Sequence, residues 1–211
     1  MIVKKMRVFS FLFIITSTIF IFKCQFLDNK GRNYKLNTSN PGKLKEFQCF
    51  FSEHGLELEV SKVDLDEVDA DPLTVIVHKA SQMDEGILVE DTSLDVEGAD
   101  IGVNVRWLIE DLEQYLGRKA IWTVLLAHRL KNEVYVYKGE IIGQIVRPVN
   151  MNNGFGFDPY FLPEGATKTL SEEKLSHVNA RALAVENFIN KKPFVISDPI
   201  YNWDGKWQEH D

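Results

Sequence analysis

The sequence contains 211 residues, of which 45% are hydrophobic, and it carries a formal net charge of −7. This length and apolar content suit one domain with a substantial core, and the acidic balance excludes a basic nucleic-acid-binding surface. Acids are densest in residues 57–100, where fourteen Asp or Glu accompany only Lys62 and Lys79. Such a stretch is either a solvated acidic surface or a source of carboxylates for a divalent metal with an anionic substrate.

The amino terminus differs in character from the rest of the chain. Residues 8–22, VFSFLFIITSTIFIF, form an uncharged apolar run. As a helix it would be about 22 Å long, shorter than the roughly 30 Å hydrocarbon core of a bilayer, so it fits a signal peptide better than a membrane span. We therefore expect an apolar leader or extension at residues 1–32, a possible signal or anchor, ahead of a domain at residues 33–211. The domain is expected in the cytoplasm unless the leader anchors or exports it.

The two cysteines, Cys24 and Cys49, are too few for a disulfide framework, and neither lies in a zinc-type spacing. Cys49 falls within a helical apolar pattern. It is therefore predicted to be a buried free thiol.

The first half of the domain alternates strands and helices. Leu44, Phe47 and Phe51 recur at helical spacing, behind Asn40 as an N-cap and Pro41 in the first turn. In chain order, the expected elements are a short strand within residues 34–40, a helix over 42–55, a strand over 56–65, a helix over 73–83 and a strand over 86–96.

The second half is expected to contain an antiparallel meander between two helices. The three apolar β segments cover residues 120–130, 133–139 and 140–148 and are joined by short turns. A helix over residues 105–117 precedes them, and a long helix over residues 171–191, opened by Ser171, follows them.

The loop NTSNPGKLKEF, residues 37–47, runs directly into the first helix. A helix start leaves backbone N–H groups unpaired, and here Lys43 adds a full positive charge beside them. The pattern favours a phosphate-binding loop, although it lacks the Walker spacing and a purely structural Pro-Gly turn is the alternative.

Two adjacent acids follow an apolar strand in the segment LVEDTSL. Burying the charges of Glu90 and Asp91 without a cation or hydrogen-bond donors would cost free energy. Mg²⁺ is the simplest candidate for the cation, because it binds one or two carboxylates together with substrate phosphates. Neighbouring residues on a strand point to opposite faces, so only one of these acids is expected to point fully into the site.

Two further segments carry polar groups beside aromatic ones. In NNGFGFDPYFLP, Phe155 and Asp158 suit stacking on a flat ring and accepting its N–H, with a packed aromatic loop as the alternative. The segment EEKLSHVNARAL, residues 172–183, places Lys174, Ser176, His177 and Arg181 on the predicted last helix, where a solvated charged face is the alternative.

Taken together and in this order, the four motifs resemble the inosine triphosphate pyrophosphatase family over about residues 34–190. The resemblance implies an elongated mixed α/β fold with a central sheet, two lobes and a deep cleft between them, usually assembled as a homodimer. It also implies Mg²⁺-dependent hydrolysis of the purine nucleoside triphosphates ITP, dITP or XTP to the monophosphate and pyrophosphate. No nucleic-acid partner is implied, and residues 8–22 offer the one route to a membrane.

The resemblance also assigns roles to residues of this chain. Glu67, in VDLDEVDADP, corresponds to a metal ligand; Asp91 corresponds to the acid that binds metal or accepts the proton of the attacking water, and Glu90 supports both. The residues assigned to the triphosphate are Thr38, Ser39, Asn40, Pro41, Gly42, Lys43, Lys79, Arg106 and Lys174. The residues assigned to the base are Phe155, which stacks on it, and Gly156, Phe157, Asp158, Ser176 and His177, which complete the pocket and bind its edge.

Three departures from the family pattern affect this interpretation. The segment EGADIGVN is shorter than the usual glycine-rich turn and has no proline, and the last motif has Val178 where arginine is expected, leaving Asn179 or Arg181 as substitutes. The third departure is the apolar leader. Two alternatives therefore stay open: a nucleotide-binding or membrane-tethered module without turnover, and a pyrophosphatase of broader base specificity.

Overall fold

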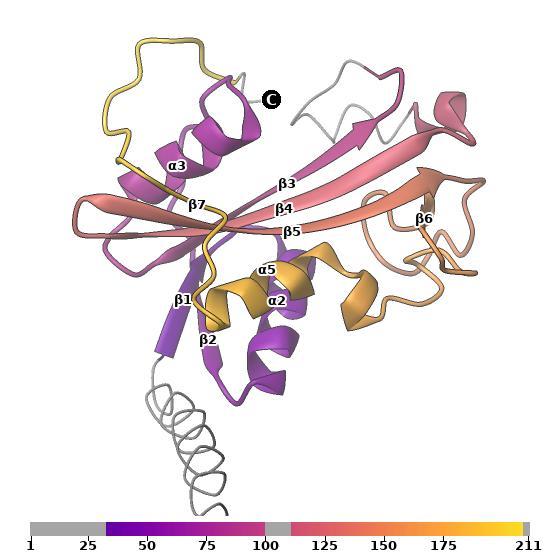
Figure 1. The fold of residues 1–211 in the computed structure, drawn as a ribbon, viewed down its shortest axis with the longest axis horizontal. Coiled ribbons are helices and arrows are strands. Elements are labelled where there is room, and N and C mark those ends of the chain that lie inside the picture. The colour runs from indigo at the N-terminus through magenta and orange to yellow at the C-terminus, as the bar shows by residue number, and fades with distance from the viewer. Residues whose placement is uncertain (1–32, 100–110, 209–211) are drawn as a thin grey trace, which may run out of the picture.

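The chain folds around one mixed β-sheet with helices on both faces (Figure 1). The structure is a computed structural model that describes residues 33–99 and 111–208. Its strands are β1 (Asn33–Asn37), β2 (Glu57–Ser61), β3 (Leu88–Val96), β4 (Lys119–Leu130), β5 (Glu133–Ile145), β6 (Phe161–Pro163) and β7 (Val195–Ser197). Its helices are α2 (Pro41–Glu53), α3 (Pro72–Gln82) and α5 (Ala180–Ile189), with short 3₁₀ turns η1 (Leu112–Tyr115) and η2 (Ser176–Val178). The predicted α/β class with a mixed central sheet is confirmed.

The amino-terminal part is a parallel β-α-β unit. Strand β1 pairs in parallel with β2 on one side and with β3 on the other. Helix α2 makes the crossover from β1 to β2; it begins behind Asn40, whose side chain caps it, with Pro41 in the first turn, as predicted. Strands β3, β4, β5 and β6 then continue the sheet as antiparallel neighbours, so the predicted antiparallel pairing of residues 120–130 with the following segment is confirmed.

One predicted break in this meander is wrong. Residues 133–139 and 140–148 were expected to be separate segments, but β5 runs without interruption through Gly139. A Cβ atom at Gly139 would lie 1.8 Å from the carbonyl oxygen of Ala180, at the start of α5. The glycine therefore allows a helix to pack directly on the strand, and it does not mark a turn.

The last helix is shorter than predicted. Helix α5 begins at Ala180, because the Asn179 side chain accepts hydrogen bonds from the backbone N–H groups of Arg181 and Ala182. Ser171, predicted to open the helix, instead donates its hydroxyl to the Val149 carbonyl oxygen. Lys174 and Arg181 are therefore not on one helix. Of the helix predicted over residues 105–117, residues 112–115 form η1, and residues 105–110 lie outside the described part of the chain.

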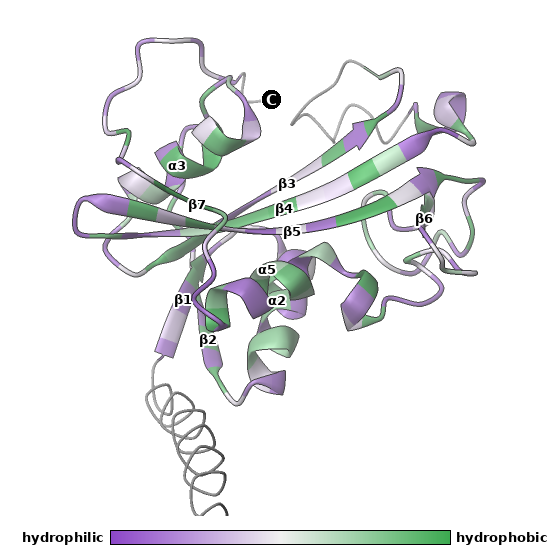
Figure 2. Cartoon of the chain, viewed as in Figure 1, coloured by the Kyte–Doolittle hydropathy of each residue, from purple (hydrophilic) through white to green (hydrophobic). Residues whose placement is uncertain are grey.

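The core has two parts, one on each face of the sheet. Leu88, Leu94 and Leu126 pack on the face covered by α2 and α5, whereas Val89 and Leu125 pack on the face covered by α3. Figure 2 shows the apolar residues on the central strands and helices and a mostly hydrophilic carboxy-terminal segment. This alternation determines where polar side chains of β3 point: even-numbered residues face α2 and α5, and odd-numbered residues face α3.

His128 lies in an aromatic cluster at the end of β4. Its ring centroid is 5.5 to 5.8 Å from those of Tyr135, Tyr137 and Phe188, and burial lowers the pKa of His128 to about 4. An unfolded histidine titrates near 6.5, so the stability contributed by neutral His128 is fully present above that pH and is lost as the pH falls toward 4.

We therefore expect the free energy of unfolding of the wild type to fall by about 2 kcal/mol more between pH 7 and pH 5 than that of His128→Phe. Urea unfolding at several pH values measures this difference. His54→Phe, a change at an exposed position, is the control and should keep the wild-type pH dependence. Parallel pH profiles for the wild type and His128→Phe would contradict the assignment.

Two predictions about individual segments can be compared with the structure. In residues 33–99 and 111–208, no helix has the length and apolar character needed to cross a bilayer, and the apolar run at residues 8–22 lies outside these ranges. Cys49 is a free thiol, but it is exposed, so its predicted burial is wrong. It lies on the outer side of α2, opposite the face that carries Phe47, Phe50 and Phe51.

Candidate active site

The loop after β1 lies beside the acids of β3 because these strands are parallel neighbours, with Asn37 opposite Val89. The Lys43 ammonium lies 2.6 Å from Glu90 Oε1. At the helix start, Asn40 Oδ1 accepts hydrogen bonds from the N–H groups of Gly42 and Lys43, at 2.9 and 3.1 Å. The expectation of unpaired N–H groups is therefore wrong for these two, while the positive end of α2 and the Lys43 charge remain beside the acids.

Glu67 and Asp91 meet at one cation. The Lys79 ammonium lies 2.8 Å from Glu67 Oε1 and 2.9 Å from Asp91 Oδ1. Glu67 lies in the loop between β2 and α3, Lys79 on α3 and Asp91 on β3. Because Glu90 and Asp91 are adjacent on a strand, they use opposite faces, Glu90 toward α2 and Asp91 toward α3. Two carboxylates from separate segments thus share one positive charge, that of Lys79.

The loop that carries Glu67 is held by the carboxy-terminal segment. The backbone N–H of Gln208 donates to the Glu67 carbonyl oxygen at 2.8 Å, and Val68 forms an antiparallel bridge with Trp207. The Asp69 N–H donates to the Lys206 carbonyl oxygen at 2.9 Å. Residues 206–208 therefore position the Glu67 loop through backbone contacts.

The two adjacent acids differ in proton affinity. Burial raises the pKa of Asp91, and the Lys79 charge offsets only part of this effect. Burial also acts to raise the pKa of Glu90, but the nearby Lys43 and Arg181 cations outweigh it and hold that pKa below its ordinary value. Burial acts to lower the pKa of Lys79, yet Asp91 and Glu67 raise it above its ordinary value. The site thus combines an ionised carboxylate with one that binds a proton more readily.

The Phe155 ring lies close to two cations. The Lys174 ammonium is 4.7 Å and the Arg181 guanidinium carbon 4.9 Å from the ring centroid. Phe155 also contacts the loop after β1, since a Cβ atom at Gly42 would lie 3.0 Å from the ring. The aromatic segment and the loop at the start of α2 therefore form one continuous site.

Asp158 stabilises the loop that carries Phe155. Its Oδ2 accepts the Phe155 N–H at 3.0 Å and pairs with the Lys174 ammonium at 2.8 Å. Lys174 also lies 2.7 Å from Glu46 Oε1 on α2. In this arrangement the Asp158 carboxylate holds the loop and Lys174 in place, whereas the sequence predicted a contact with the base.

Comparison with known proteins identifies the family of the chain. The sequence model of the Ham1 family matches residues 35–191. The chain belongs to the Ham1 family. A dITP/XTP pyrophosphatase of Thermococcus kodakarensis is 28% identical over 172 residues, covering 72% of this chain and 93% of that protein. A dITP/XTP pyrophosphatase of Porphyromonas gingivalis is 31% identical over 183 residues, covering 70% and 91%.

Solved structures of the family support the fold. The Ham1 protein of Staphylococcus aureus superposes with a TM-score of 0.58 at 18% identity, over 76% of this chain and 97% of that one. A HAM1 protein from Coxiella burnetii superposes with a TM-score of 0.57 over 75% of this chain. The resemblance inferred from the four motifs is therefore confirmed at the level of family and fold.

Some residues that the family motifs assigned to the site lie outside this cluster. Ser176 and His177 are exposed on η2. Phe157 is buried in the core, with its ring centroid 5.8 Å from that of Trp122. Gly156 has a positive φ of 61° in the tight loop that Asp158 braces. Arg106 lies outside the described residues.

Arg181 lies at the centre of the cluster although the motif pattern placed the arginine elsewhere. It is 2% exposed, pairs with Glu46 Oε2 at 3.1 Å and donates to Thr92 Oγ1 at 3.3 Å. Its guanidinium carbon also lies 5.3 Å from the Trp122 ring centroid. Asn179 caps α5, so of the two substitutes considered for the expected arginine, Arg181 is the one that brings positive charge to the cluster.

Glu46, Thr92 and Trp122 are site residues that sequence reasoning missed. Glu46 carried the one available signal, since it lies one helical turn after Lys43 on α2. Trp122 follows the strand pattern and Thr92 the acidic motif, so neither is distinguishable from a structural residue in the sequence. Their roles follow from the tertiary contacts of Arg181.

The residues present fit a divalent cation held together with a substrate phosphate. Mg²⁺ binds oxygen ligands and commonly uses one or two carboxylates plus phosphates. Glu67 and Asp91 provide two carboxylates that approach the same cation. Across the described ranges, no three His, Cys, Asp or Glu side chains gather as a metal site, because Glu90 is directed to Lys43. Glu67 and Asp91 therefore suit a cation site with two protein carboxylates, in which phosphate oxygens of the substrate would be the remaining ligands.

Proposed function

We propose that the chain is a Mg²⁺-dependent nucleoside triphosphate pyrophosphatase that converts ITP, dITP or XTP to the monophosphate and pyrophosphate. The names of its relatives support the reaction class. The observation that carries the proposal is the convergence of Glu67 and Asp91 on Lys79, directly beside the Lys43 loop at the start of α2. A polyphosphate tail with a bound metal suits this arrangement of opposite charges.

The mechanism assigns separate tasks to the acids and the cations. Bound Mg²⁺ would neutralise phosphate charge and orient the reacting groups. Asp91, or Glu67 beside it, accepts the proton of the water that attacks the α-phosphorus, and a raised pKa of Asp91 suits a general base. Lys43 and Lys79 stabilise the negative charge that develops on the pyrophosphate leaving group.

Base selection follows from the donors around Phe155. Hypoxanthine and xanthine present a 6-keto acceptor where adenine presents an amino donor. Lys174 and Arg181, which flank Phe155, carry donors only, so they favour the keto bases stacked on that ring. Both groups already have carboxylate partners in Glu46 and Asp158, so their positive charge beside the ring, rather than an unpaired donor, is what favours a keto oxygen over the amino group of adenine.

A substrate panel tests this proposal. We expect the purified chain with Mg²⁺ to release pyrophosphate from ITP, dITP and XTP with a kcat/KM about 10²-fold or more above that for ATP. GTP, UTP and CTP complete the panel, with pyrophosphate and orthophosphate measured separately. Similar rates on all bases would establish the broader pyrophosphatase, and nucleotide binding without pyrophosphate release would establish the module without turnover.

We also propose the division into a leader at residues 1–32 and a catalytic domain at residues 33–211. The family match begins at residue 35, which supports a boundary there. The homodimer, the two-lobed cleft and the cytoplasmic location stay predictions from the family resemblance.

A further inference from the structure

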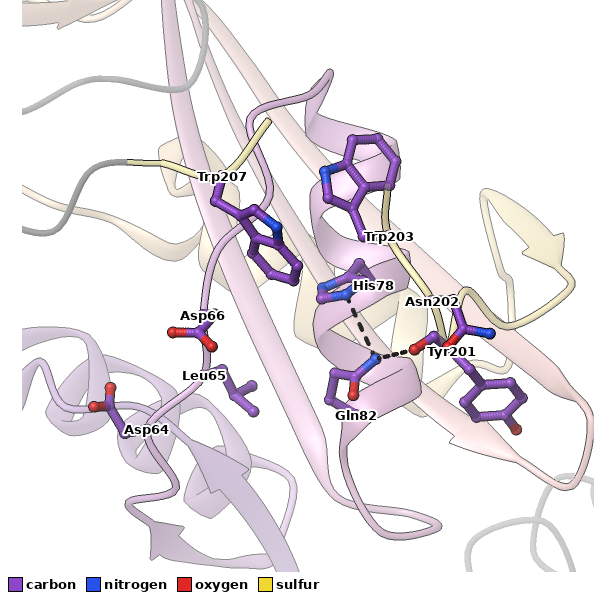
Figure 3. Close-up of a pocket in the computed structure, with 9 residues that line it drawn as sticks. All are labelled: Asp64, Leu65, Asp66, His78, Gln82, Tyr201, Asn202, Trp203 and Trp207. Carbon is purple, nitrogen blue, oxygen red and sulfur yellow. Dashed lines mark hydrogen bonds between the residues drawn. The ribbon is translucent and has the colours of Figure 1, made fainter. Parts of the chain in front are cut away.

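A pocket of about 470 Å³ lies on the outer side of α3, next to the Glu67 loop (Figure 3). Its size is within the range of small-molecule sites. Three segments form it: residues 64–66 of the loop before α3, His78 and Gln82 on α3, and residues 201–207 of the carboxy-terminal segment. Lys79, the next residue on α3, belongs to the candidate active site, so the pocket and that site share a helix and a loop.

The aromatic wall of the pocket is fixed in position. Trp207 is held by its bridge to Val68, and its ring meets the His78 ring edge-on at a centroid distance of 5.6 Å. The Trp203 indole N–H donates to the Lys206 carbonyl oxygen at 2.7 Å. A Cβ atom at Gly205 would lie 2.6 Å from the Trp203 ring, so the glycine lets the indole fold back on its own loop. Rings fixed in this way lose little freedom when a ligand binds.

The rest of the lining consists of two aspartates in the loop before α3 and a buried histidine on α3. Asp64 and Asp66 line the pocket opposite α3. His78 is 3% exposed, and its Nδ1 has no hydrogen-bond partner. Burial lowers the pKa of His78 although Asp66 acts to raise it, so the imidazole adds no positive charge to the pocket at neutral pH. His78 lines the pocket, and a buried nitrogen without a partner favours a polar group that can come within hydrogen-bond distance of it.

We propose that this pocket binds a small organic ammonium compound. Indole faces attract cations, and carboxylates beside them add electrostatic attraction, which together recognise ammonium groups in aromatic cages. The same two aspartates repel nucleotides and other anions, so the pocket does not serve the triphosphate. Trp207 exposes nearly half of its surface, which an ammonium ligand would cover.

The position of the pocket links it to the Glu67 loop. Trp207 lies between the pocket and Val68, and the next residue, Gln208, donates its backbone N–H to the Glu67 carbonyl oxygen. A ligand held by Trp207 therefore restrains the segment that positions Glu67. This consequence rests on the proposed function, whereas binding itself does not.

Calorimetric titration of the full-length chain with choline chloride, in sodium phosphate without nucleotide or Mg²⁺, tests the proposal. We expect one saturable site per chain and a Kd at least about tenfold weaker for 3,3-dimethyl-1-butanol, the neutral isostere of choline. Trp207→Leu and Asp66→Asn should each weaken choline binding severalfold. Phe194→Leu is the matched control, because Phe194 is an exposed aromatic residue that does not line the pocket.

Each other outcome overturns the proposal. Equal affinity for choline and its neutral isostere would show that the pocket does not recognise the positive charge. A Kd for choline weaker than about 10 mM would show that the pocket is not a specific ammonium site. Choline affinity that is unchanged in Trp207→Leu would place the ligand elsewhere. Since the titration needs no turnover, its failure is distinguishable from failure of the pyrophosphatase proposal.

Discussion

Replacing Asp91 with asparagine is expected to lower the kcat for pyrophosphate release from ITP by about 10²- to 10⁴-fold, the usual effect of removing a general base. Asparagine keeps the size of the side chain and an oxygen that can accept from Lys79, so the chain should stay folded. It removes the negative charge that would bind metal and the group that would accept the proton from water. Steady-state kinetics with ITP and a thermal melt of the same sample measure both effects.

Asp95→Asn provides the matched control. Asp95 lies on the same strand and the same face as Asp91, but it is exposed. Its replacement should leave the kcat within about twofold of the wild type, since surface substitutions have small effects. Turnover by Asp91→Asn close to that of Asp95→Asn would remove Asp91 from the mechanism.

Replacing Arg181 with leucine is expected to damage both stability and nucleotide binding. The substitution leaves Glu46 with Lys174 alone and removes a buried cation from Thr92 and Glu90, at a cost of about 3 kcal/mol in the free energy of unfolding. It also removes one of the two cations beside Phe155, so the KM for ITP should rise more than the KM for ATP. Urea unfolding and kinetics on the two substrates measure these effects.

Arg181→Lys separates the charge from the shape of the guanidinium. Lysine keeps the positive charge but lacks the planar guanidinium, whose two terminal nitrogens contact Glu46 and Thr92 separately. The free energy of unfolding of Arg181→Lys should therefore lie between those of Arg181→Leu and the wild type. Arg118→Leu, at an exposed position outside the cluster, should match the wild type. If Arg181→Leu keeps the wild-type ratio of kcat/KM for ITP to that for ATP, Arg181 has no part in base selection.

Local signals were sufficient for much of the fold. The Asn40 cap with Pro41 predicted the start of α2, and the apolar run of residues 120–130 predicted β4. The errors arose where long-range packing determines the conformation. Gly139 is a close-contact site for α5 and not a turn, and only the three-dimensional structure shows this. The short strands β6 and β7 depend on pairing with β5, so the sequence around them gives no period of its own.

The sequence predicted which residues belong to the candidate site better than it predicted which of them contact one another. Glu67, Lys79 and Asp91, which the motifs assigned to one site, lie within ion-pair distance, while their roles there stay predictions. The sequence could not show that Asp158 accepts the Phe155 N–H and pairs with Lys174, because these contacts depend on loop geometry. Arg181 takes the central position because Asn179 caps α5, which begins at Ala180, and Arg181 in the first turn pairs with Glu46.

The central claim is that Glu67 and Asp91 hold one divalent cation together with the polyphosphate. Electron paramagnetic resonance of Mn²⁺, which prefers the same oxygen ligands, measures it directly in a titration of the chain with a non-hydrolysable ITP analogue. One bound Mn²⁺ per chain is predicted, with affinity weakened about 10- to 100-fold or more in Glu67→Gln and in Asp91→Asn. Mn²⁺ binding at wild-type affinity in both variants would contradict the claim.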